Sequence, residues 1–392
     1  MRIALNALIA SHFTLMAPFA WALRAAGHDV LVVGGADVAA AARDAGLTAR
    51  AVDPATRRLE SGTAAPAAPV PAAPGADPAG GSAREQLLRR KAPQLRLAAA
   101  GLAEELGAWR PDLVITDPLG YAARVAAAVL GVPVAVHRWG IQEPHGETEE
   151  AARRVFGPLC AELGGPAGLP EPLLTLDPCP PALRVPGTEP AEPVRHQPTP
   201  GRYEVPDWAL AAPAGERVCV LLGVWGARLL AEGGRLADTV AAIAAAVAGP
   251  GREVLVLLPP EHHLGLGELP AGVRVHGPLP LDLVLPGSVA VVHHGGNGTA
   301  LAAVARGVPQ LVLPAERPEL AVFGQQVAAA GVGRLLTAAD GDPLAALPAA
   351  LAEVIADPAY RKAAEAVGAE VAAMPAPAEL VPLLERLVRS AA

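Results

Sequence analysis

Residues 291–300 read VVHHGGNGTA, where an apolar run breaks into two histidines and a cluster of glycines. The run VAVVHH (289–294) is typical of a buried strand, and ALAAVARG (300–307) is typical of a buried helix. This order of strand, turn and helix predicts one unit of a parallel α/β sheet. A helix start presents N–H groups without partners, and glycines let an anion approach the backbone. The stretch therefore predicts either a plain turn or a phosphate site.

Two common phosphate-binding patterns are absent from this turn. It contains neither GxxxxGK[ST], with no lysine nearby, nor the dinucleotide pattern GxGxxG. A diphosphate held by backbone N–H groups and by His294 is therefore a better match than a triphosphate with Mg²⁺. We expect Thr299 to cap the helix and to add a hydroxyl donor.

The alternation of strand and helix continues through both halves of the chain. In the first half, strand-like runs alternate with helical stretches, the strands at 2–9, 29–35, 47–52, 112–117 and 133–137 and the helices at 13–27, 37–46 and 121–131. In the second half, the strand-like runs are 217–223, 252–258, 272–277, 289–294, 309–314 and 332–336, with helices at 236–248 and from about Thr299. The pattern predicts an α/β protein with two doubly wound, Rossmann-like parallel-sheet domains facing across a cleft. In such sheets ligands bind beyond the carboxyl ends of the strands.

Two proline-rich regions divide the chain. Residues 55–83 are rich in Pro, Ala and Gly without periodicity, which predicts a mobile loop in the first domain. Residues 176–208 separate the two sets of strands and helices. We predict a first domain over residues 1–200, a second over 201–375, and a final helix over 376–392 that packs back on the first domain.

Composition and charge exclude several classes of function. The net charge is −8 and the basic residues form no patch, so binding to nucleic acid or to an anionic membrane is not expected. The cysteines have no metal or redox spacing, which fits a reducing cytoplasm; they are Cys160, Cys179 and Cys219. No cleavage site follows the first residues, and no stretch free of Pro and charge is long enough to span a membrane. A soluble cytoplasmic protein is expected.

The glycine-rich stretch resembles the donor-binding signature of glycosyltransferase family 1, the nucleotide-sugar enzymes with the GT-B fold. The likeness covers HHGGNGT and the following ALAAVARGVPQLVLP (293–314). Segments GPLPLDLVLPG (277–287), LLGVWG (221–226) and PELAVFGQQVAAAGVG (318–333) are similar to the family's base, phosphate and sugar segments in order and spacing. SHFTLMAPFAWALRAAGHDV (11–30) and LDPCPPALRVPG (176–187) resemble the actinobacterial branch that decorates polyketides, notably macrolide and spinosyn-type enzymes.

The resemblance implies a general base in the first domain. His12 lies just beyond the first strand, and it matches the residue that deprotonates the acceptor hydroxyl in this family. Asp117 ends the strand DLVITD at the same edge as His12 and matches the family's partner aspartate. Asp112 begins that strand, at the opposite end, and is expected to be a solvated residue at the strand start. The first domain should bind the acceptor through the loop 55–83, the segment after Trp139 and an acceptor pocket formed by Phe13, Met16, His137 and Trp139. For Phe13 and Met16 a core position is an equal alternative.

The resemblance places the donor in the second domain. Its diphosphate would lie against His294, Gly295, Gly296, Asn297, Gly298 and Thr299, under the loop Gly223, Val224 and Trp225. The family often has Ser or Thr in that loop, so backbone contacts or Arg228 would replace a hydroxyl here. Pro278 stands where the family has a tryptophan beside the base, which leaves Leu279 and its backbone as the base contact. Glu319, with Glu316 in reserve, stands where relatives have an aspartate that binds the sugar, and Gln325 would be its polar partner.

No metal site is expected. Asp340-Gly341-Asp342 has the DxD form of metal-dependent glycosyltransferases but sits in a turn away from any phosphate loop. His262 and His263 have no third ligand at a suggestive spacing. His293 has no assigned role beyond finishing its strand.

These features predict an inverting, metal-independent glycosyltransferase. It would move a deoxysugar such as rhamnose from a dTDP-sugar co-substrate to a hydroxyl of an apolar polyketide-type acceptor, without a cofactor. A homodimer and an auxiliary activator protein stay open as partners. Two alternatives keep the fold: a nucleotide-sugar 2-epimerase, and a non-catalytic partner that binds a nucleotide sugar.

Overall fold

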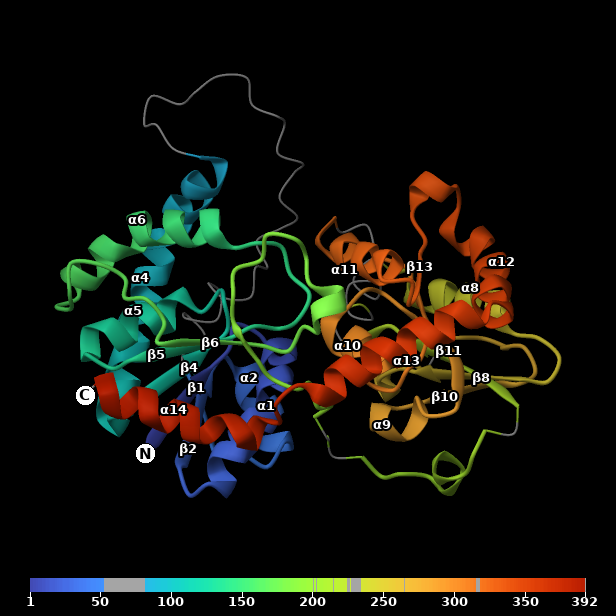
Figure 1. Cartoon of the computed structure of the whole chain (residues 1–392), viewed down its shortest axis with the longest axis horizontal. Coiled ribbons are helices and arrows are strands. Elements are labelled where there is room, and N and C mark those ends of the chain that lie inside the picture. The colour runs from blue at the N-terminus through green and yellow to red at the C-terminus, as the bar shows by residue number, and fades with distance from the viewer. Residues whose placement is uncertain are drawn as a thin grey trace.

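The computed structural model describes residues 1–52, 82–199, 201, 203–213, 215–223, 226, 234–263, 265–314 and 318–391. The predicted loop 55–83 lies outside this part except for its last two residues, as do Val224, Trp225, Arg228 and Glu316. The side chain of Glu319 is also outside it. The described part forms two parallel-sheet domains that lie side by side, which confirms the predicted fold class (Figure 1).

The N-terminal sheet is parallel throughout and follows the order β3-β2-β1-β4-β5-β6-β7. Its strands are β1 (Arg2–Asn6), β2 (Asp29–Gly34), β3 (Ala49–Ala51), β4 (Leu113–Thr116), β5 (Val134–His137), β6 (Leu174–Asp177) and β7 (Glu192–Pro193). Strands β1 to β3 are added toward one edge of the sheet, and β4 to β7 are added toward the other edge. The topological switch point therefore lies between β1 and β4. Ligands of doubly wound sheets bind beyond the carboxyl ends of the strands at such a point.

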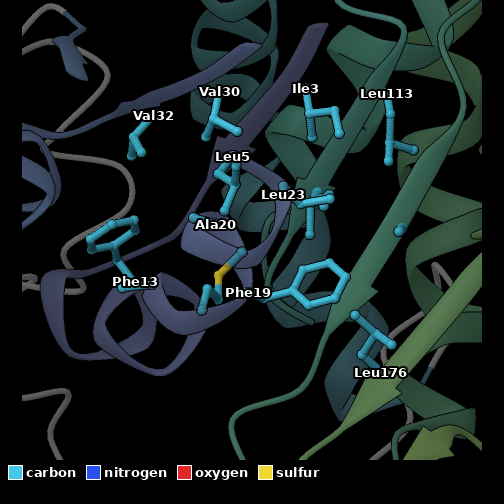
Figure 2. Close-up of a cluster of buried hydrophobic side chains, with 14 of the residues drawn as sticks. Ile3, Leu5, Phe13, Phe19, Ala20, Leu23, Val30, Val32, Leu113 and Leu176 are labelled. Atoms are coloured by element: carbon cyan, nitrogen blue, oxygen red, sulfur yellow. The ribbon is translucent and has the colours of Figure 1, made fainter. Parts of the chain in front are cut away.

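Helices cover both faces of this sheet (Figure 1). One face carries α1 (Ala10–Ala25), α2 (Ala36–Asp44) and the C-terminal α14 (Pro377–Ala391). Figure 2 shows the core on this side, where Phe13 and Phe19 of α1 lie against Leu5, Val32 and Leu176 of the sheet. The other face carries α4 (Ala83–Trp109), α5 (Tyr121–Leu130) and α6 (Gly146–Glu162). The sequence patterns predicted neither α4 nor α6.

The C-terminal sheet has the order β10-β9-β8-β11-β12-β13 and is also parallel. Its strands are β8 (Glu216–Leu221), β9 (Arg252–Leu257), β10 (Val273–His276), β11 (Ser288–His293), β12 (Gln310–Val312) and β13 (Gly333–Leu335). Its helices are α8 (Leu236–Val247), α9 (Leu281–Val284), α10 (Asn297–Ala305), α11 (Pro318–Ala329), α12 (Pro343–Ala356) and α13 (Pro358–Ala373). Short 3-10 turns are η1 (Pro181–Leu183), η2 (Asp207–Leu210), η3 (Pro260–His262) and η4 (Ala338–Asp340). The strand positions confirm the predicted second set.

The proline-rich region 176–208 is more than a connection between domains. It contains the end of β6 and all of β7, so it completes the N-terminal sheet. Its Cys179 and Leu183 are buried against Val304 and Val327 of the C-terminal domain. Proline at β7 is compatible with a strand because β7 is an edge strand. The region therefore also forms part of the contact between the domains.

The last helix returns to the first domain. Leu380, Leu384 and Val388 of α14 are buried in the same cluster as Phe19 and Leu23 of α1. Among the described residues, no single helix has the length and apolar composition to cross a membrane. The helices α13 and α14 reach that composition only together, and they are bent by 42° where they meet.

Candidate active site

A histidine and an aspartate meet at the carboxyl edge of the N-terminal sheet. Asp117 directly follows β4, and His12 lies in the first turn of α1, the helix that follows β1. The Nδ1 of His12 lies 3.1 Å from Oδ2 of Asp117, and the two side chains are 19% and 1% exposed. The structure thus brings together the two residues predicted as base and partner.

The carboxylate of Asp117 is held in one orientation by the backbone. The Leu8 N–H donates to Oδ2 over 2.6 Å and the Leu119 N–H donates to Oδ1 over 2.8 Å. Because Asp117 has only acceptors when ionised, His12 contributes its Nδ1–H to this contact. The Nε2 of a neutral His12 is then the free acceptor, which is the form that a general base requires.

Trp139 covers the other side of the imidazole. Its ring centroid lies 4.4 Å from that of His12 with an interplanar angle of 30°. The ring of His145 lies against the same indole in a T-shaped arrangement, with 6.0 Å between the two ring centroids. Trp139 follows β5, so three strand ends contribute to this group. Of the predicted acceptor residues, Trp139 is the one that lies beside the base.

The acceptor-pocket prediction is wrong for three other residues. Phe13 and Met16 are 0% and 1% exposed and belong to the core between α1 and the sheet, as the alternative had it (Figure 2). Their positions on α1 place them on the helix face that packs against the sheet. His137 is also buried, and its Nδ1–H donates to the Arg138 carbonyl over 2.7 Å. Burial lowers the pKa of His137 to about 4, so it is neutral and structural.

The glycine turn after β11 leaves a helix start open. Gly295 has a φ of +95°, and a Cβ at this position would lie 2.9 Å from the Leu320 carbonyl oxygen, so the turn requires glycine. Helix α10 begins at Asn297, with Gly296 as its N-cap and the Ala300 N–H as the first donor to Gly296. Thr299 therefore lies inside the first turn, and the prediction that it caps the helix is wrong. The N–H groups of residues 297–299 lie in the first turn of α10 and so have no hydrogen-bond partner within the helix.

His294 fills the space beside this helix start. Cβ atoms added to Gly223 and Gly296 would lie 2.7 and 2.8 Å from its ring, so both glycines permit close approach. The side chain is buried, and its Nδ1 has no hydrogen-bond partner in the part of the chain described. Burial lowers the pKa of His294 to about 4, and the Leu221 carbonyl opposes this shift. A buried polar atom without a partner at a helix start has the chemistry of an anion-binding site.

His293 has a role that the sequence patterns missed. Its Nδ1 accepts the Gly295 N–H over 3.1 Å, and its Nε2–H donates to Oε1 of Gln310 over 2.8 Å. Gln310 in turn donates to the Ala300 carbonyl over 3.3 Å. This chain joins the turn, β12 and α10 through one neutral imidazole, and burial lowers the pKa of His293 to about 3. His293 is thus the residue that fixes the turn, and a second histidine beside three glycines was the only signal for it.

The two halves of the site meet at Asn297. Its side-chain Oδ1 accepts the Ile141 N–H over 2.9 Å, and its Nδ2–H donates to the Ile141 carbonyl over 3.1 Å. Ile141 follows Trp139 by two residues, and Asn297 is the first residue of α10. The helix start with the predicted phosphate site is thereby joined to the loop that covers the predicted base.

A cavity of about 510 Å³ lies between the domains. Gln325 of α11 lines it together with residues from the segment after Trp139, namely Glu143, Pro144, Gly146 and Glu147. Glu189 and Arg84 also line it. Gln325, predicted to bind the sugar, thus lies at the same cavity as the predicted acceptor segment. Leu279 is buried in the C-terminal core, so a base contact there would come from its backbone.

The two candidate metal motifs have structural roles in the described part. Asp342 is the N-cap of α12, and its carboxylate accepts the Leu344 N–H over 3.0 Å. The Nε2 of His263 lies 2.7 Å from the Leu258 carbonyl oxygen. Among the described residues, no group of three or more His, Cys, Asp or Glu side chains has an arrangement that could hold a metal ion.

Comparison with known proteins identifies relatives along nearly the whole chain. It matches the two domains described as Erythromycin biosynthesis protein CIII-like, the N-terminal one over residues 21–223 and the C-terminal one over residues 241–387. It is 35% identical over 384 residues to L-demethylnoviosyl transferase of Streptomyces niveus, with 96% of each chain covered. It is 33% identical over 414 residues to tylactone mycaminosyltransferase of Streptomyces fradiae, covering 96% of this chain and 90% of that one.

Solved structures show the same likeness. Spinosyn rhamnosyltransferase SpnG has a TM-score of 0.81 and 32% identity, covering 98% of this chain and 100% of its own. Structures of SpnG complexed with thymidine diphosphate and with spinosyn aglycone are similar at TM-scores of 0.81 and 0.80. Family domains over most of the chain, named transferases as relatives and this shared fold lead to one conclusion. The chain belongs to the erythromycin biosynthesis protein CIII-like family, and it is a nucleotide-sugar-dependent glycosyltransferase of natural-product biosynthesis with the GT-B fold.

Proposed function

We propose that this enzyme transfers a deoxysugar from a dTDP-sugar to a hydroxyl of a polyketide-type acceptor, with inversion at the anomeric carbon. The observation that carries the proposal is the hydrogen-bonded pair of His12 and Asp117, positioned beside a loop that is joined to the open helix start of α10. A base on one domain and an anion site on the other are the two elements that direct sugar transfer requires.

In this mechanism His12 acts at its Nε2. The acceptor hydroxyl gives its proton to Nε2 while its oxygen forms a bond to the anomeric carbon. The bond from that carbon to the diphosphate breaks, and dTDP leaves with the electron pair from the opposite side, which inverts the configuration. Asp117 stabilises the protonated imidazole through Nδ1–H, as a buried carboxylate does in other catalytic pairs.

The leaving diphosphate would be received by the C-terminal domain. The N–H groups of residues 297–299 lie in the first turn of α10 and have no partner within the helix, and together with the positive end of α10 they favour an anion there. The unpartnered, buried Nδ1 of His294 has the chemistry of a further donor once a phosphate oxygen supplies an acceptor. These groups would neutralise the leaving group in place of a metal ion. Activity unchanged by EDTA is the expected result, and loss of activity that Mg²⁺ restores would contradict this part.

The relatives support the choice of substrates. By their names, those relatives are an L-demethylnoviosyl transferase and a tylactone mycaminosyltransferase, and SpnG is a rhamnosyltransferase with a thymidine diphosphate complex. The cavity between the domains is lined by Gln325 and by the segment after Trp139, and neither His12 nor the start of α10 lines it. It is therefore proposed to hold parts of the substrates that are remote from the reacting atoms. Glu319 is the proposed sugar-binding carboxylate, with Glu316 in reserve.

The test is a panel of dTDP-deoxysugars and polyketide aglycones, with product mass as the readout and the anomeric configuration of the product by NMR. The substitution His12→Ala should lower kcat by about 10²- to 10⁴-fold, the range of general-base contributions. His262→Ala, at a histidine of the η3 turn, is the matched control and should leave kcat unchanged. Native-rate transfer by His12→Ala would refute the base, and conversion of a nucleotide sugar without acceptor would favour an epimerase.

A further inference from the structure

We infer that the side chain of Asn297 is a positioning residue that couples the donor-binding helix to the catalytic base through Trp139. The inference rests on the proposed function of His12 and of the α10 helix start. It assigns to the Asn297 amide a task separate from the binding of phosphate, which falls to backbone N–H groups. Three consecutive contacts connect Asn297 with His12.

The first contact is reciprocal. Asn297 Oδ1 accepts the Ile141 N–H over 2.9 Å and Asn297 Nδ2–H donates to the Ile141 carbonyl over 3.1 Å. One side-chain amide thus pairs with both polar groups of one residue, as a neighbouring strand would. A pair of bonds in this geometry fixes the orientation of the loop, whereas a single bond would leave it free to turn.

The second contact is steric and involves the same loop. Gly140 has a φ of +118°, and a Cβ there would lie 2.8 Å from Cδ1 of Leu301 and 3.0 Å from Oδ1 of Asn297. Leu301 lies four residues, or about one helical turn, after Asn297 on α10. The loop backbone therefore lies directly against one face of this helix. The absence of a side chain at residue 140 is what allows the amide of Asn297 to reach Ile141.

The third contact leads to the base. Gly140 is preceded by Trp139, whose indole lies 4.4 Å from the His12 imidazole, centroid to centroid. His12 is held on its other side by Asp117 at Nδ1. The Trp139 indole lies against one face of the imidazole, and Trp139 directly precedes the Gly140–Ile141 segment that contacts α10.

The coupling has a direct consequence for the reaction. A diphosphate bound at the start of α10 orders the same turn that carries Asn297, and Asn297 then orders the loop over His12. The base is therefore aligned with the acceptor when the donor site is formed. Misplacement of a reacting group by about 1 Å costs on the order of 10²-fold in rate, so this alignment should be visible in kcat.

The test is Asn297→Ala, which removes both bonds without adding bulk at the helix start. We expect kcat for sugar transfer to fall by about tenfold or more. The affinity for dTDP, measured by calorimetry, should change by less than about threefold, because backbone groups make the phosphate contacts. Gly140→Ala changes the loop partner of the same contact and pushes the loop away from α10, so it should give the same separation of kcat from affinity.

Glu370→Ala is the matched control. Its carboxylate also joins the domains through a side-chain-to-backbone bond, accepting the Ala182 N–H over 3.0 Å, but it does so between α13 and the η1 turn. It should leave kcat unchanged. An equal loss of kcat in Glu370→Ala and Asn297→Ala would mean that any loosening of the domains suffices, and the inference would be wrong.

A double-mutant cycle distinguishes coupling from independent damage. If Asn297 acts through Trp139, then adding Asn297→Ala to Trp139→Leu should lower kcat by less than about a further twofold. Multiplicative losses would overturn the coupling. This readout differs from that of a merely structural role, since separate destabilising changes are additive in free energy.

A final measurement does not need activity. The ring current of Trp139 should shift the proton resonance of the His12 Cε1–H, which is assigned by its loss in His12→Gln. Asn297→Ala should move this resonance and Glu370→Ala should not. If wild-type enzyme transfers no sugar but the resonance moves, the proposed function fails and the coupling stands. A resonance that stays in place in Asn297→Ala overturns the coupling itself.

Discussion

Asp117→Asn is the change that tests the base most closely. The substitution replaces one carboxylate oxygen by an NH₂ group and keeps the shape of the side chain. Three donors converge on this carboxylate: the Leu8 N–H at 2.6 Å, the Leu119 N–H at 2.8 Å and the His12 Nδ1–H at 3.1 Å. Because the two backbone donors face different oxygens, the NH₂ group meets a backbone N–H in either orientation.

The expected losses of stability and of kcat follow from these contacts. Leaving a buried donor without a partner costs about 1–3 kcal/mol, so the free energy of unfolding should fall by that amount. Unit charges about 4 Å apart attract by about 4 kcal/mol at the effective dielectric of a protein surface. His12 is partly exposed, so we take about 3 kcal/mol of this as lost from the protonated imidazole, which is on the order of 10²-fold in kcat.

The assay is kcat for sugar transfer together with urea unfolding. Asp112→Asn is the control, since Asp112 lies at the other end of β4 and accepts a single backbone N–H, from Arg2 over 2.7 Å. An amide can turn its oxygen toward that one donor, so activity should stay within about twofold. The double variant with His12→Ala should be no slower than His12→Ala alone by more than about threefold. Transfer by Asp117→Asn at the wild-type rate would refute the pairing.

Three further predictions concern the buried histidines and the glycine turn. Burial lowers the folded-state pKa of four histidines to between about 3 and 4, below the value of 6.5 in the unfolded chain; they are His137, His196, His293 and His294. As the pH falls from 6.5 toward 4, the unfolded chain therefore binds more protons than the folded protein does. The free energy of unfolding should fall over this window by on the order of 2–3 kcal/mol per histidine. A urea midpoint that stays constant between pH 7.5 and 5 would contradict this prediction. His293→Ala leaves the Gly295 N–H and the Gln310 side chain without their partner, so we expect about 1–3 kcal/mol lower stability and weaker dTDP binding by calorimetry; unchanged dTDP affinity would show that the turn is fixed without it. Gly295→Ala places a Cβ at a φ of +95° and 2.9 Å from the Leu320 carbonyl, so a loss of about 2 kcal/mol or more and of dTDP binding is expected, whereas Gly131→Ala, with an open surrounding at a φ of +66°, should cost only about 1–2 kcal/mol and leave dTDP binding intact.

The strands of both sheets could be predicted from the sequence because strand and helix patterns are local. Strand and helix patterns alternate regularly, and the turn after residue 294 marks a strand end and a helix start within a few residues. Placing His12 and Asp117 at one edge required only that β1 and β4 be parallel neighbours. What failed were predictions that depend on the direction of a side chain. Phe13 is adjacent to His12 in sequence, yet it points into the core because consecutive helical residues lie about 100° apart.

Contacts between distant segments were outside the reach of these patterns. Asn297 and Ile141 are separated by 156 residues, and their pairing depends on how the two domains meet. The role of His293 depends likewise on Gln310 of the neighbouring strand. The proline-rich region 176–208 concealed β7, since two residues of an edge strand give no periodic signal. Local patterns therefore indicated where the candidate site lies in the sequence, and tertiary packing determines which of its residues are in contact.

The return of α14 to the N-terminal domain affects how the chain can be made and recombined. Leu380, Leu384 and Val388 complete a core that is otherwise built from residues 1–194, so the ribosome synthesises the whole C-terminal domain before that core can close. The core of the N-terminal domain can therefore be completed only after α14 has been synthesised, although most of that domain is translated first. A hybrid enzyme made by joining two relatives near residue 200 would set a foreign α14 against α1. A working exchange of acceptor domains should use two junctions, with residues 377–391 travelling together with the N-terminal half.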